Sequence, residues 1–134
     1  MSKQQAYMPP SKSDIHETPD KIYDWIKETY GWSKEQLNDP CPVNPICNAL
    51  HIVWDTINFV NPPYTLLSDF VAHAIRQADE YGCISIMLLP AKTDQQWFHS
   101  LVAREYDIHW IKGRLKFKGH KYHATQPHFL VLIK

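Results

Sequence analysis

A strand–helix–strand pattern in the middle of the chain constrains the fold more than any other feature. A short β-prone run, residues 56–60, stops before two successive prolines, Pro62 and Pro63. Apolar residues then recur at helical spacing as far as Gly82, and residues 84–89 are almost wholly apolar. A strand without polar–apolar alternation is typical of burial on both faces. The pattern therefore predicts an α/β fold with buried central strands.

Capping residues before this unit predict a first helix. Thr18 is expected to be its N-cap, with Pro19 at the first helical position and Gly31 closing the helix. The spacing of Ser33 and Gln36 is that of a capping box, and it predicts one short helical turn.

The remaining elements are expected after the buried strand. Thr93 or Asp94 is expected to cap a helix that continues to about Arg104. Three final strands are expected at residues 107–112, 114–117 and 128–133. Alternating strands and helices around buried strands predict a three-layer α/β sandwich. We expect a single domain over residues 18–134, preceded by a flexible arm over residues 1–17.

Size and composition limit the classes of function. The 134 residues suffice for one domain, but not for a catalytic domain plus a separate recognition domain. Hydrophobic residues make up 44% of the chain, which excludes a disordered protein. The longest apolar stretch, residues 83–91, is about half a membrane span. We expect no membrane partner and a cytoplasmic location in a bacterial or phage-infected cell, or a nuclear or viral one for a eukaryotic virus.

The sequence Asn61-Pro62-Pro63-Tyr64 stands at the carboxyl end of a predicted strand, directly before a helix. Ligands of open α/β sheets collect at the carboxyl ends of strands. One interpretation is a proline-rich strand stop with a capping Asn. The other is a site that methylates a conjugated amino group, and the position in the fold favours this second interpretation.

Such an amine is a poor nucleophile, because its lone pair is delocalised into the ring or carbonyl. The side-chain oxygen of Asn61 and the carbonyl of Pro62 can each accept one of its N–H bonds. That arrangement favours a pyramidal nitrogen whose lone pair points at a methyl donor, through positioning and preorganised electrostatics. Tyr64 would supply a face on which a flipped-out base stacks.

Four stretches, in matching order, resemble the phage-type, Dam-like DNA N6-adenine methyltransferases. They are Thr18-Pro19, Asn61-Pro62-Pro63-Tyr64, residues 89–94 with 97–99, and residues 112–117. The resemblance extends from about His16 to Ile133. It implies a reduced Rossmann-like methyltransferase fold that transfers a methyl group from S-adenosylmethionine to the exocyclic amine of adenine in DNA.

The resemblance also assigns residues to two roles. The catalytic set for binding the amine and stacking the base is Asn61, Pro62, Pro63 and Tyr64. The cofactor contacts are Thr18, Pro19, Asp39, Asp55 and Asn61, with Asp55 a substitute for the usual ribose-binding acidic residue. The chain departs from the usual methyltransferase pattern, because the loop Pro40-Cys41-Pro42, within a proline-rich stretch at residues 38–48, replaces the glycine-rich turn.

Basic residues gather near the C-terminus, where no acidic residue follows Ile108. On a strand, alternate residues share one face and form a phosphate-contacting strip, here Lys112, Arg114, Lys116 and Lys118. The alternative is a solvated edge strand protected by lysines. Lys92 and Thr93 either line the substrate pocket or belong to a helix cap. The net charge of zero therefore conceals an acidic front half and a basic tail.

The leading hypothesis is a DNA adenine-N6 methyltransferase without a metal ion. The alternatives are methylation of RNA or of a protein glutamine, and a non-catalytic DNA-binding or partner subunit. Neither Cys41, Cys47 and His51 nor the C-terminal histidines have the spacing of a zinc site. A chain too short for a recognition domain predicts a very short site, loose specificity, or contacts from a second copy or partner subunit.

Overall fold

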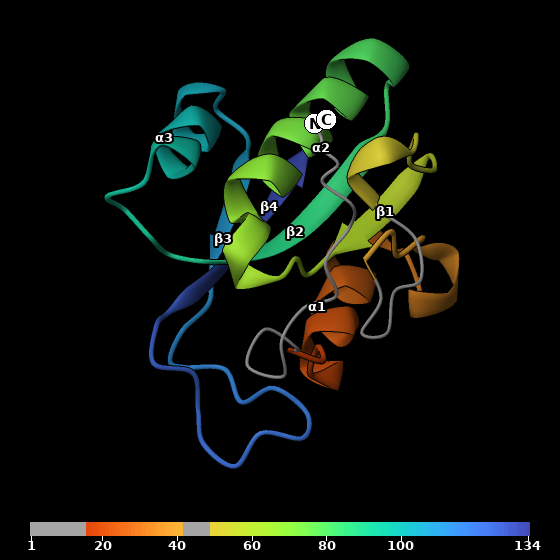
Figure 1. The fold of residues 1–134 in the computed structure, drawn as a ribbon. Helices are drawn as coiled ribbons and strands as arrows, with labels where there is room; N and C mark the ends of the chain where they lie inside the picture. The colour runs from red at the N-terminus through yellow and green to blue at the C-terminus, as the bar shows by residue number, and fades with distance from the viewer. Residues whose placement is uncertain (1–15, 42–48) are drawn as a thin grey trace.

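The computed structural model describes residues 16–41 and 49–134, so the predicted arm lies almost wholly outside the described residues. The chain forms a four-stranded sheet flanked by helices (Figure 1). The main elements are α1 (Asp20–Tyr30), β1 (Ile57–Val60), α2 (Leu67–Tyr81), β2 (Ile84–Pro90), α3 (Gln96–Ala103), β3 (Asp107–Trp110) and β4 (His128–Ile133). Single helical turns are η2 (Lys34–Gln36), η3 (Ala49–His51) and η4 (Tyr64–Leu66).

The strand order in the sheet is β1-β2-β4-β3. Strands β1 and β2 are parallel and are joined by α2, as a crossover connection requires. Strand β4 is antiparallel to both β2 and β3, so β1, β2 and β3 all run in the same direction. One edge of the sheet therefore carries the carboxyl ends of three strands together with the amino end of β4.

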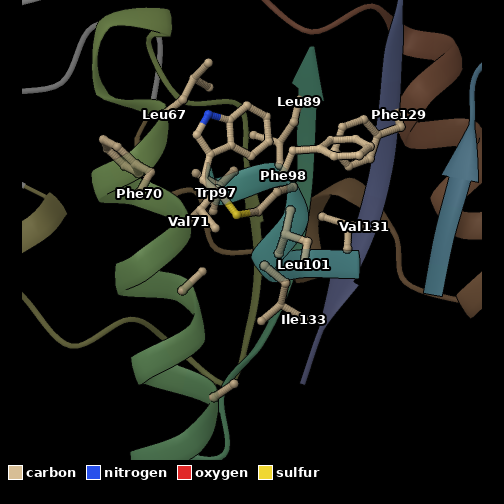
Figure 2. Close-up of a cluster of buried hydrophobic side chains, with 14 of the residues drawn as sticks. Leu67, Phe70, Val71, Leu89, Trp97, Phe98, Leu101, Phe129, Val131 and Ile133 are labelled. Carbon is tan, nitrogen blue, oxygen red and sulfur yellow. The ribbon is translucent and has the colours of Figure 1, made fainter. Parts of the chain in front are cut away.

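Helices cover both faces of the sheet, and alternate residues of each central strand point to opposite faces. Met87 and Leu89 of β2 belong to the core that α2 and α3 cover (Figure 2). Ile86 and Leu88 belong to a second core beneath α1. This two-sided burial explains why residues 84–89 lack polar–apolar alternation, and it confirms the predicted α/β fold.

Three predicted helix boundaries were tested by the backbone. Gly31 closes α1 in the left-handed conformation (φ 81°), and the capping box of Ser33 and Gln36 is present, as expected. The prediction that Thr18 caps α1 is wrong, because Pro19 takes the N-cap position in an extended conformation.

The predicted cap of α3 is also wrong. The helix begins at Gln96 with Gln95 as N-cap, so neither Thr93 nor Asp94 caps it. The reason is a turn that precedes the helix, in which the Gln95 N–H donates to the Lys92 carbonyl at 3.1 Å.

The predicted strand at residues 114–117 does not form. Gly113 adopts a left-handed conformation (φ 78°) and turns the chain after β3, which ends at Trp110 rather than at residue 112. The segment that follows lies against the α1 face without joining the sheet. Leu115 and Phe117 are buried there, while the residues between and beside them are exposed. The sequence alternates as in a strand, but its apolar side covers a core instead of pairing with β4.

Candidate active site

The Asn-Pro-Pro-Tyr sequence leaves the sheet at the edge where the carboxyl ends of β1, β2 and β3 meet. It follows β1 directly, and Tyr64 begins the turn η4 ahead of α2. Pro62 and Pro63 are both buried, and neither can donate a backbone hydrogen bond to a neighbouring strand. The two prolines therefore end the strand and hold Asn61 and Tyr64 on a rigid connection.

The side-chain amide of Asn61 is oriented by the segment before α1. Its nitrogen donates to the Thr18 hydroxyl at 3.1 Å and to the backbone carbonyl of His16. A carbonyl can only accept, so the amide nitrogen must face His16, and Oδ1 is directed to the other side. None of the described residues donates a hydrogen bond to this oxygen. The geometry thus leaves Oδ1 as a fixed acceptor for an external N–H group.

Tyr64 is held at its ring and at its hydroxyl. The imidazole of His16 stacks on the ring, with centroids 4.2 Å apart and an interplanar angle of 27°. The hydroxyl lies 2.5 Å from Nε2 of His128, at the amino end of β4. The ring therefore joins the N-terminal segment, the end of β1 and the start of β4.

His128 is a site residue that the sequence analysis missed. It is only 2% exposed, and burial lowers the pKa of its imidazole to about 4, so the ring is neutral at neutral pH. Nδ1 lies 3.1 Å from the Gln126 carbonyl, which can only accept, so Nδ1 carries the proton. Nε2 is then the acceptor, and Tyr64 donates to it. The available signal was a polar residue opening an otherwise apolar strand.

Two of the predicted cofactor residues lie beside Asn61. Thr18 is buried and bonded to it, and Pro19 follows Thr18 directly. Asp39 follows Asn38, which pairs with Asn58 in parallel along the free side of β1. The parallel pairing places Asp39 near the carboxyl end of β1, within roughly two residues or 7 Å of Asn61 along the strand direction.

Asp39 has a perturbed environment, whereas Asp55 is far from the motif. The surrounding protein removes water from the Asp39 carboxyl group and raises its pKa, although the Cys41 N–H donates to it at 2.9 Å. Asp55 is exposed and lies before β1, at the opposite end of that strand from Asn61. The structure therefore brings Thr18 and Pro19 to Asn61 and places Asp39 near the same end of β1, whereas Asp55 lies at the opposite end of that strand.

The strand that was expected to carry the basic strip does not form at residues 114–117, whereas the expected contact of these basic residues with DNA stays a prediction. Lys112 is separated from the others by the turn at Gly113. Arg114, Lys116 and Lys118 are exposed on the outer side of the segment that covers α1. Two of the three are engaged within the protein.

Arg114 donates to the Thr125 carbonyl at 2.5 Å, and Lys118 forms an ion pair with Asp20 at 2.6 Å. No ion pair is found for Lys116 among the described residues. Lys92 and Thr93 follow β2 at the same edge of the sheet as Asn61, and the Thr93 carbonyl accepts a bond from His99 at 2.7 Å. Lys92, which is half-buried, and Lys112, which is exposed, each lie two residues after the carboxyl end of a strand, β2 and β3 respectively.

A cavity of about 390 Å³ opens beside Tyr64. The cavity is lined by His16, Tyr64, Phe117 and residues 120–126. Its volume lies within the usual range for small-molecule sites. The cavity thus combines aromatic walls with a position next to the Asn-Pro-Pro-Tyr sequence.

A family model described as DNA N-6-adenine-methyltransferase (Dam) matches residues 5–129. The chain belongs to this family. The resemblance inferred from the sequence motifs is therefore confirmed. No curated protein and no solved structure matches the chain significantly.

Membership of the Dam family implies DNA as the substrate and a methyl donor as the second reactant. The match includes β1, the Asn-Pro-Pro-Tyr sequence, β2 and the first two residues of β4. Across residues 16–41 and 49–134, no three His, Cys, Asp or Glu side chains gather as metal ligands; Cys47 lies outside these ranges. Within the same part of this Dam-family chain, no helix is long and apolar enough to cross a membrane.

Proposed function

We propose that the chain transfers a methyl group from S-adenosylmethionine to the N6 amine of an adenine in DNA, at the Asn-Pro-Pro-Tyr sequence. The observation that carries this proposal is the fixed amide of Asn61. Thr18 and His16 hold its nitrogen, so Oδ1 is presented as an acceptor without any rearrangement. An acceptor held in place before the substrate arrives costs no reorganisation during the reaction.

In this proposal the base leaves the duplex and its ring stacks on Tyr64. One N–H of the amine donates to Oδ1 of Asn61 and the other to the carbonyl of Pro62. These two bonds draw the nitrogen toward a pyramidal geometry and make its lone pair available to an electrophilic carbon. No general base is required, because the proton leaves to solvent after the new C–N bond has formed. The rigid prolines supply the positioning.

The residues around Asn61 fit one side of an S-adenosylmethionine site. When bound, this group supplies an electrophilic methyl carbon on a sulfonium. Thr18 and Pro19 would contact it beside Asn61, and the Asp39 carboxylate provides acceptors for ribose hydroxyls or for an amino group. Asp55 is left out of the proposed set, because it lies at the far end of β1. The parallel direction of β1, β2 and β3 supports a reduced Rossmann-like methyltransferase sheet.

Only some of the basic residues assigned to DNA binding have side chains free of hydrogen bonds and ion pairs with the described part of the chain. Lys92 with Thr93, Lys112 and Lys116 are placed to contact phosphates, because they are exposed or half-exposed. Arg114 and Lys118 first have to release Thr125 and Asp20. So small a set of contacts supports loose recognition, or help from a second copy or a partner subunit.

One contact favours the alternative of a non-catalytic DNA-binding or partner subunit. His16 covers a face of Tyr64 on which a base would stack. In an active enzyme this imidazole gives way to the base, whereas in a non-catalytic subunit it would stay in place. The same stacking distance of 4.2 Å also indicates that Tyr64 accepts a flat heteroaromatic ring.

Mass spectrometry of digested DNA from cells expressing the protein tests the proposal. We expect N6-methyladenine in the DNA, its loss in Asn61→Ala, and no change in the control Ser68→Ala, an exposed position in the first turn of α2. Circular dichroism should show that Asn61→Ala is folded. If DNA stays unmodified while the purified protein still binds duplex, and calorimetry detects no S-adenosylmethionine binding, the non-catalytic alternative is correct.

A further inference from the structure

The hydroxyl of Tyr64 is anchored by a histidine that touches neither of the proposed reacting groups. We propose that His128 is a positioning residue, which fixes the plane of the Tyr64 ring for base stacking by accepting its hydroxyl hydrogen. This proposal rests on the proposed function for its consequence in catalysis. The contact itself is a property of the folded chain and can be tested without any activity.

The first argument is the rigidity of the place from which His128 acts. It is the first residue of β4 and is paired with Pro90 of β2. On the other side its carbonyl accepts a bond from the Ile111 N–H at 3.1 Å. Its ring also packs edge-on against Phe117, with centroids 5.3 Å apart. A side chain on a paired strand positions its partner more accurately than one on a loop.

The second argument is the direction of the hydrogen bonds. The Gln126 carbonyl takes the proton on Nδ1, so Nε2 has a lone pair and no proton. Nε2 lies 2.5 Å from the Tyr64 oxygen, so the phenol must be the donor. Three groups from two segments thereby form one directed chain, from Tyr64 through His128 to Gln126.

The third argument is the charge of the ring. An imidazolium donates from both nitrogens and could not accept from Tyr64. Burial keeps the ring neutral, and the nearby His16 opposes a positive charge there as well, while the Gln126 carbonyl favours it. The acceptor is therefore present throughout the neutral pH range.

The consequence for catalysis follows from the freedom of a tyrosine side chain. Rotation about the bond to the ring is broad, so packing alone defines its plane loosely. His16 restrains the ring from one side, but a base would have to replace that contact. The bond to His128 lies at the tip of the ring and does not compete with stacking. It keeps the ring in one plane when the base arrives.

The contact can be tested directly by long-range ¹H–¹⁵N correlation spectra of the full chain labelled at histidine. We expect His128 in the Nδ1–H form, uncharged down to about pH 4. In Tyr64→Phe we expect the Nε2 signal to shift, because its hydrogen bond is lost. Finding the Nε2–H form, or no response to Tyr64→Phe, would overturn the proposal.

A double-mutant cycle tests the role in methyl transfer. We expect His128→Leu to lower kcat about ten- to a hundredfold, with little change in the KM for S-adenosylmethionine, because a small misplacement of a reacting group is costly. His128→Gln should recover most of the rate, since its carbonyl can accept from Tyr64. In the Tyr64→Phe background, His128→Leu should cost nothing further.

An equal loss in both backgrounds would mean that His128 only fills space, and this would overturn the proposal. If the wild-type chain transfers no methyl group at all, the proposed function fails. The spectra of His128 and of Tyr64→Phe then still decide whether the positioning contact exists.

Discussion

The two faces of the sheet are built in different ways. On one face, α2 connects β1 to β2 and α3 connects β2 to β3. The apolar residues of these two helices and of the strands form one large core (Figure 2). On the other face, α1 from the start of the chain meets an irregular segment from residues 111–124. His16 and Phe117 approach each other on this second side, with ring centroids 5.1 Å apart.

The difference separates stability from function. The hydrogen bonds described above for the side chains of Asn61 and Tyr64 go to the segment before α1 and to the start of β4. The face covered by α2 and α3, called the helical face below, thus works as a scaffold. The second face brings the segment before α1 close to the start of β4, and the site forms where these two segments meet.

The largest effect on stability is expected on the helical face. Phe70 in α2 is 1% exposed and belongs to the core on this face, where its ring centroid lies 6.3 Å from that of the buried Trp54. Phe70→Ala should lower the free energy of unfolding by about 3–5 kcal/mol, because the regular elements around it cannot collapse into the cavity. Chemical denaturation measures this change. A loss below that of Phe117→Ala would contradict the division between the two faces.

His128 should make stability depend on pH on the second face. Its pKa is about 4 in the folded chain and near 6.5 when unfolded, so the unfolded chain binds more protons between these values. Stability should therefore fall as the pH drops from 6.5 toward 4, by at most about 3 kcal/mol. Comparing denaturation curves of the wild type and His128→Gln isolates this contribution, since other titrating groups are common to both. If the free energy of unfolding of the two proteins changed with pH in the same way, folding would not lower the pKa of His128.

Phe117→Ala should have a smaller effect on stability than Phe70→Ala but a larger effect on methylation. Phe117 is 3% exposed, yet it lies on a segment with few backbone hydrogen bonds, so its surroundings can relax into the space. We expect a loss nearer 2 kcal/mol. Its ring lines the cavity and packs on both His16 and His128, so N6-methyladenine in DNA should fall strongly. Unchanged methylation in Phe117→Ala would mean that the cavity takes no part in the reaction.

The same division explains how much could be predicted from the sequence. The end of helix α2 and both ends of strand β2 were predicted to within one residue, because Gly82 closes the helix and the strand is a continuous apolar run. Residues 114–117 alternate like a strand, and no local signal distinguishes a strand from a segment that covers a core. The motif revealed Asn61 and Tyr64, but not the contacts that hold them.

Those contacts depend on the tertiary fold. Thr18 was predicted to cap a helix, whereas its hydroxyl accepts a bond from Asn61, 43 residues later. The bond between Tyr64 and His128 spans 64 residues. Residues so far apart carry no shared pattern in one sequence, and only the order of the strands brings them to the same edge.

The smallest effects are expected from the lysines on the outer surface of the second face. Lys118 is paired with Asp20. The ion pair raises the pKa of the Lys118 ammonium group and lowers the pKa of the Asp20 carboxyl group, so both charged forms are favoured. Lys116 has no such partner among the described residues. DNA affinity measured against salt concentration should therefore lose about 0.9 from its logarithmic slope in Lys116→Ala, if one phosphate contact is removed.

Lys118→Ala should change that slope less than Lys116→Ala, because its charge is already committed within the protein. Asp20→Asn is the sharper experiment, since it frees Lys118 without removing any positive charge. We expect tighter DNA binding and a slope steeper by up to about 0.9. Equal slopes for the two lysine variants, with no gain from Asp20→Asn, would mean that the outer surface of this face does not contact DNA. The second face would then contribute to the site only through the side chains of Phe117, His16 and His128 beside Tyr64.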